Sequence, residues 1–94
     1  MKPVSFKSVW DAIESSPAEA ANMKARSDVL IAIRKVVEAW NVTQAEAAQR
    51  LGINQPRVND LLRGRIDKFS LDALMNLAAR AGLSVRVKVV RPAA

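Results

Sequence analysis

Residues 43–64 read TQAEAAQRLGINQPRVNDLLRG, and this stretch decides the fold. Thr43 can cap a short helix, because its hydroxyl can accept from a first-turn N–H while a glutamate three residues later reaches back. Gly52 stands where the end of that helix needs a left-handed residue. Asn54 can cap a second helix, which Gly64 then ends. The stretch therefore predicts two short helices joined by a tight turn.

Small and apolar side chains recur at helical spacing on one face of each of these helices. They are Ala47, Ala48 and Leu51 in the first helix and Val58, Leu61 and Leu62 in the second. Small residues allow two helices to cross closely through a short turn. This is the helix-turn-helix unit, whose second helix enters the DNA major groove. The alternative is an ordinary helical hairpin in an all-α core, but caps, glycine and buried positions together favour the helix-turn-helix.

Composition limits the classes of function. The chain has 94 residues, a formal net charge of +6, and neither cysteine nor histidine. The length predicts one domain over residues 1–94, and the basic charge favours nucleic acid or an acidic membrane surface as partner. Without histidine or cysteine, the commonest general base and metal ligands are missing. No carboxylate or Ser–Lys spacing forms a recognisable site, so we expect no enzyme, no metal and no cofactor.

No apolar run approaches the ~20 residues that a membrane span needs. Asp11 and Glu14 interrupt the N-terminal stretch, so it does not resemble a signal peptide. We expect a soluble, cytoplasmic protein without a membrane partner.

Helical patterns continue on both sides of the motif, giving a predicted helical body over residues 8–82. Ser8 can cap a first short helix, and a Ser-Pro pair opens a long helix over residues 16–40. Asn41 is a plausible left-handed stop. Ser70 can cap a last helix, which Gly82 ends.

Residues 84–90 change to a period of two. Val85, Val87 and Val89 alternate with basic residues, the pattern of a half-buried strand. A lone strand leaves its backbone groups unpaired, and the helical body offers no second strand. The simplest partner is the same strand of a second copy in a two-fold dimer, and Val4–Phe6 is the internal alternative. Such a dimer would set two recognition helices ~34 Å apart on a palindromic DNA site.

The outward residues of the second helix are of the types that contact DNA. Gln55, Arg57 and Asn59 are predicted to read bases, because amides pair with adenine and arginine with guanine. Residues at the helix starts and in the exit loop are predicted to contact phosphate. They are Gln44, Asn54, Arg63, Arg65 and Lys68. A plain solvated face is the alternative, and Asp60 could orient Arg57 or Arg63, or simply face away from DNA.

The strings TQAEAA, LG, QPRV and DLLRG, with FSLDAL after them, resemble the XRE (Cro/repressor-like) helix-turn-helix family over about residues 8–90. More narrowly, the chain is similar to small HigA-type antitoxin regulators. In such repressors the glutamine that opens the first motif helix touches phosphate and the one that opens the recognition helix reads adenine. Gln44 and Gln55 fall at those two positions. Members often have Thr and Ser where this chain has Asn54 and Asn59, so the resemblance carries over no operator sequence.

Together, the residue patterns predict an all-α, five-helix, repressor-like helix-turn-helix domain with a C-terminal β-strand that pairs in a homodimer. The resemblance implies autorepression and a RelE/HigB-like ribonuclease toxin as partner. Trp10, Ile13 and Met23 are predicted to contact that toxin, although packing on their own core is an equal alternative. A free-standing regulator without a toxin and a protein-interaction module are the other interpretations.

Overall fold

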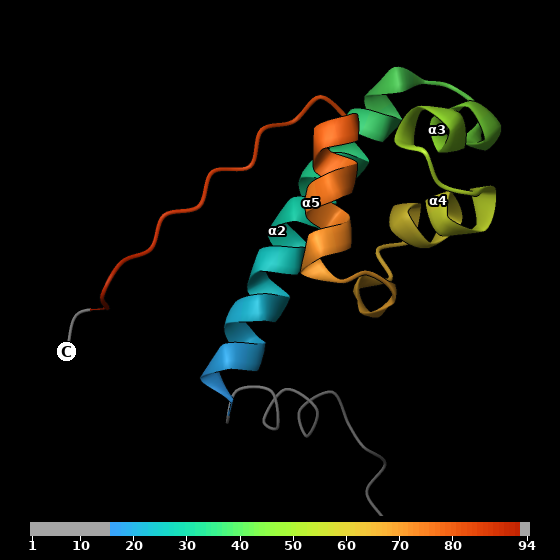
Figure 1. Cartoon of the computed structure of the whole chain (residues 1–94). Helices are drawn as coiled ribbons and strands as arrows, with labels where there is room; N and C mark the ends of the chain where they lie inside the picture. The colour runs from blue at the N-terminus through green and yellow to red at the C-terminus, as the bar shows by residue number, and fades with distance from the viewer. Residues whose placement is uncertain (1–15, 93–94) are drawn as a thin grey trace, which may run out of the picture.

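The computed structural model describes residues 16–92, which form an all-helical body (Figure 1). Its elements are α2 (Pro17–Trp40), α3 (Gln44–Leu51), α4 (Gln55–Leu62), the single 3-10 turn η1 (Ile66–Lys68) and α5 (Leu71–Arg80). The predicted short helix from Ser8, with Trp10 and Ile13, lies outside the described residues, as does Val4–Phe6. The described part therefore has four α-helices, where the sequence predicted five for the whole chain. None of these helices combines the length and the apolar sequence needed to cross a bilayer.

Each α-helix of this body begins at the cap that the sequence predicts. In every case a side-chain oxygen of the capping residue accepts a hydrogen bond from a backbone N–H three residues later. The bonds run from Glu19 N to Ser16 Oγ (3.4 Å), Glu46 N to Thr43 Oγ1 (3.1 Å), Arg57 N to Asn54 Oδ1 (2.9 Å) and Ala73 N to Ser70 Oγ (3.1 Å). These local bonds set the helix starts, so the four caps predicted within residues 16–92 are confirmed.

Left-handed backbone ends both α2 and α3. Asn41 follows α2 with φ 53° and ψ 48°, as predicted. Gly52 follows α3 with φ 72°, and a Cβ built there would lie 2.9 Å from the Arg80 guanidinium. The turn between the motif helices therefore needs glycine mainly for its backbone conformation.

The core lies where α2 meets α5 and the α3–α4 pair. Figure 1 shows α5 running alongside α2, with α3 and α4 stacked to one side. The buried apolar residues are Leu30, Ile33, Val37, Ala47, Ala48, Leu51, Val58, Leu61, Phe69, Leu74, Leu77 and Ala78. The predicted inner faces of the motif helices are thus confirmed, except that Leu62 is only half-buried. Trp40, the last residue of α2, is also half-buried.

The terminal segment, residues 84–90, does not form the predicted strand. It has no regular secondary structure and leaves the helical body beyond α5 (Figure 1). The physical reason is that a strand needs a second backbone to pair with, and residues 16–92 of one chain contain none. In this single chain Val85, Val87 and Val89 are 36%, 73% and 90% exposed, and the packing of their face on the helices, which was predicted for the dimer, stays a prediction.

Candidate nucleic-acid interface

Helix α4 buries one face and presents the opposite face to solvent. Val58 and Leu61 are fully buried against the core. Gln55 and Asn59 of α4 and Arg63, which directly follows the helix with right-handed backbone, are spaced four residues apart, so they share one stripe of its surface. Gln55 and Arg63 are exposed and Asn59 is half-buried. The stripe therefore carries two amide side chains and one guanidinium away from the core.

Arg57 lies outside this stripe, turned toward the protein body. Its guanidinium carbon is 4.5 Å from the centroid of the Phe69 ring, a cation–π contact. Its Nη1 donates a hydrogen bond to the backbone carbonyl of Lys68 at 3.1 Å. Arg57 is predicted to read a base, and to do so it would have to leave the Phe69 ring.

The predicted phosphate-contacting residues at the helix starts are accessible. Gln44 is the exposed first residue of α3, and Asn54 is the exposed cap of α4. The Asn54 side-chain oxygen is occupied by the Arg57 N–H, which leaves its NH₂ group as the available donor. Both positions therefore offer donors of the kind that phosphate oxygens accept.

The exit loop after α4 carries the remaining basic residues. Arg65 Nη1 lies 3.3 Å from Asp60 Oδ1, with the Arg65 side chain 46% exposed and that of Asp60 20% exposed. The partner of Asp60 is thus Arg65, where the sequence suggested Arg57 or Arg63. Lys68 is exposed. The loop therefore presents one paired and one solvated cation next to α4.

The sequence analysis missed two arginines that lie against the loops before and after α4. Arg26 of α2 donates from Nη1 to the carbonyl oxygens of Ile66 and Phe69, each 3.4 Å away. Arg80 of α5 brings its guanidinium to the Gly52 turn. Neither position shows a local sequence signal, because both contacts join segments far apart in the chain.

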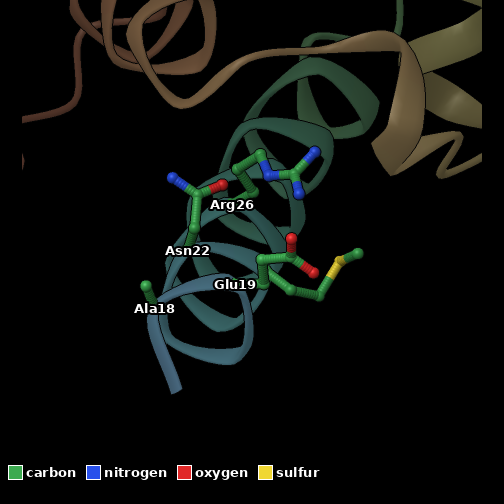
Figure 2. A pocket seen from close by; sticks show the side chains of 5 residues that line it. Ala18, Glu19, Asn22 and Arg26 are labelled. Carbon is green, nitrogen blue, oxygen red and sulfur yellow. The ribbon is translucent and has the colours of Figure 1, made fainter. Parts of the chain in front are cut away.

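A second surface feature lies on the first half of α2. A shallow recess is lined by Ala18, Glu19, Asn22, Met23 and Arg26, all on this one helix (Figure 2). Met23, one of the predicted toxin-contacting residues, is half-buried there. The recess is separate from the outward stripe of α4.

The helices α3 and α4 each have one buried and one exposed face and are joined by a tight turn, and together they define a helix-turn-helix domain. The family model described as a helix-turn-helix domain matches residues 12–90, so the chain belongs to that family. A solved structure described as a putative XRE-family transcriptional regulator is 30% identical, with a TM-score of 0.71 over 79% of this chain and 83% of that chain. No curated protein matches the chain significantly. Within the helix-turn-helix class, the chain is therefore of the XRE type.

Proposed function

We propose that this protein is a sequence-specific DNA-binding transcriptional repressor without enzymatic activity. The observation that carries the proposal is the outward stripe of α4. A helix held by Val58 and Leu61 presents Gln55 and Asn59 on its free face. Amide side chains on such a face can pair bidentately with adenine in the major groove. The membership of the XRE type and the basic net charge of +6 support the same conclusion.

In this proposal α4 enters the major groove, and Gln55 and Asn59 contact base edges. Gln44 and Asn54 at the helix starts contact the phosphate backbone, as do residues of the exit loop after α4. Arg57 is the third predicted base reader, and it would have to give up its contact with Phe69 to reach a base. Phosphate contacts position the protein on the duplex, while the α4 side chains select the sequence.

The test is binding of the whole protein to the DNA upstream of its own reading frame. We expect an affinity well above that for a random duplex. This affinity should fall steeply as the salt concentration rises, because lysine and arginine side chains that bind phosphates release the counterions of the DNA. Equal binding to every sequence would remove the repressor proposal. Absence of any salt-sensitive binding would favour the protein-interaction module instead.

In a homodimer, two copies of this small domain would bind the two half-sites of one DNA site. Most large apolar side chains exposed in the described residues lie in the terminal segment, including Val87 and Val89. Beside that segment is a groove between α2 and α5, lined by apolar residues that include Val29, Leu71 and Met75. Antiparallel pairing of two terminal segments would satisfy their backbones and bring their valines toward these grooves.

The antitoxin role extends this proposal and is supported by the resemblance to HigA-type regulators. A RelE/HigB-like toxin would bind away from α4, on the first half of α2 around Met23. Co-expression with the neighbouring reading frame tests this. Co-purification and relief of growth arrest are expected, and the absence of both would leave a free-standing XRE-type regulator.

A further inference from the structure

The exit loop of residues 65–69 is attached to α4 by a side chain of the recognition helix itself. Arg57 Nη1 donates to the Lys68 carbonyl oxygen at 3.1 Å. The same guanidinium lies 4.5 Å from the centre of the Phe69 ring, which is only 1% exposed. Arg57 therefore covers an anchoring residue of the loop and fixes one of its carbonyl groups.

A second arginine, which belongs to α2, contacts the same loop. Arg26 of α2 points its Nη1 at the carbonyl oxygens of Ile66 and Phe69, at 3.4 Å each. These are long hydrogen bonds, but both come from a cation and both join segments about forty residues apart. The exit loop is thus bracketed by guanidinium groups from α4 and α2.

The geometry of Arg57 suits this attachment better than it suits base reading. An arginine that recognises guanine directs two N–H donors outward to the O6 and N7 atoms. Here the guanidinium lies over an aromatic ring and gives a donor to the protein backbone. Its position on α4 also falls outside the stripe of Gln55, Asn59 and Arg63.

We propose that Arg57 and Arg26 are positioning residues that hold the exit loop so that Arg65 and Lys68 meet the DNA backbone beside α4. The inference rests on the proposed DNA binding. A loop that is already ordered avoids the entropic cost of ordering its side chains on the duplex. Because phosphate is the same at every base pair, this contribution raises affinity for all sequences equally.

The test compares Arg57→Met, Arg57→Lys and Arg26→Met with the wild-type protein, and uses Gln55→Ala as the base-reading control. The probes are a duplex selected from a random library by the wild-type protein, its single-base-pair variants, and one random duplex, each over a range of salt. We expect Arg57→Met to weaken binding to the selected and random duplexes by the same factor, roughly 2- to 10-fold, the cost of ordering one side chain. The salt slope should become shallower by about 0.9 for each phosphate that the loop no longer neutralises.

Two further variants separate positioning from simple loss of stability. Arg57→Lys keeps a cation over Phe69 and a donor for the carbonyl, so it should restore most of the affinity. Arg26→Met should repeat the uniform loss, although Arg26 belongs to α2 and not to the recognition helix. If Arg57→Met fails to fold in a circular-dichroism melt, these two variants decide the question by the same criteria.

Three results would overturn the inference. A relaxed preference at one base pair, with random-duplex binding unchanged, would show that Arg57 reads a base. Unchanged binding of Arg57→Met to both duplexes would show that the loop does not depend on it. If selection with the wild-type protein enriched no duplex from the random library, the proposed function itself would fail, and this inference with it.

Discussion

Replacing Gln55 with alanine is the most informative change to the recognition helix. Gln55 is the first residue of α4, it is exposed, and it lies outside the buried core. Its truncation therefore removes a side chain from the outward stripe while Val58 and Leu61 stay packed. The free energy of unfolding should change by no more than about 0.5 kcal/mol, as is usual for a surface substitution.

The expected effect is weaker recognition of one base pair. A bidentate amide–adenine pair contributes about 1–3 kcal/mol of discrimination. At 1.4 kcal/mol per tenfold change, this corresponds to a dissociation constant roughly 5- to 150-fold higher on the preferred duplex. Binding to a duplex that already carries the wrong base pair should hardly change, because Gln55 makes no bidentate pair there.

Fluorescence anisotropy measures the dissociation constants for the preferred duplex and for a panel of its single-base-pair variants. Gln49→Ala is the matched control, since Gln49 is an exposed glutamine on α3 outside the predicted contact set. We expect this control to bind like the wild-type protein. Base reading by Gln55 is refuted if Gln55→Ala keeps full affinity, or if it weakens binding by the same factor on every duplex while its melting temperature is unchanged.

Three other changes test separate parts of the structure. Lys68→Ala should weaken binding to all duplexes alike and flatten the salt slope by about 0.9, seen in a salt titration, because Lys68 is predicted to contact phosphate and no base. Gly52→Ala should destabilise the fold by about 1–2 kcal/mol in chemical denaturation, since φ at this turn is 72° and the nearby Arg80 group can move. Val87→Pro should yield monomers in sedimentation at micromolar concentration, because proline removes a donor from the proposed strand pairing; a variant that stays fully dimeric would place the interface on the helices.

Features that depend on neighbouring residues in the chain could be predicted from the sequence. A cap at Thr43, Asn54 or Ser70 needs only a side-chain oxygen and an N–H three residues later. The left-handed stop at Asn41 is likewise a local property of the backbone. Helical spacing then identified the buried faces, because a surface helix buries residues at a fixed period.

The contacts of long side chains could not be predicted in this way. Arg57 has the residue type of a base reader, and only the three-dimensional path of the exit loop brings Phe69 and the Lys68 carbonyl beneath it. Arg26 meets the same loop from α2 across about forty residues of sequence. A one-dimensional pattern assigns an exposed arginine to solvent or to DNA, because it contains no information on which distant carbonyl groups lie within reach.

The conformation of the terminal segment could not be predicted from the sequence for a different reason. The alternation of Val85, Val87 and Val89 describes which faces of an extended chain differ in polarity. It does not supply the second backbone that a strand must pair with. In the described residues of a single chain this partner is absent, so the segment has the sequence of a strand without its hydrogen bonds.

An NMR titration of the isotope-labelled protein with its preferred duplex tests most directly whether α4 reads DNA. We predict that the side-chain amide resonances of Gln55 and Asn59 shift and show intermolecular contacts to major-groove protons of the bases. Backbone resonances of Gln44, Asn54 and Lys68 should shift as phosphate neighbours. Shifts confined to α2 and α5, with the α4 side chains unchanged, would show that α4 is not the reading helix and place the binding surface elsewhere.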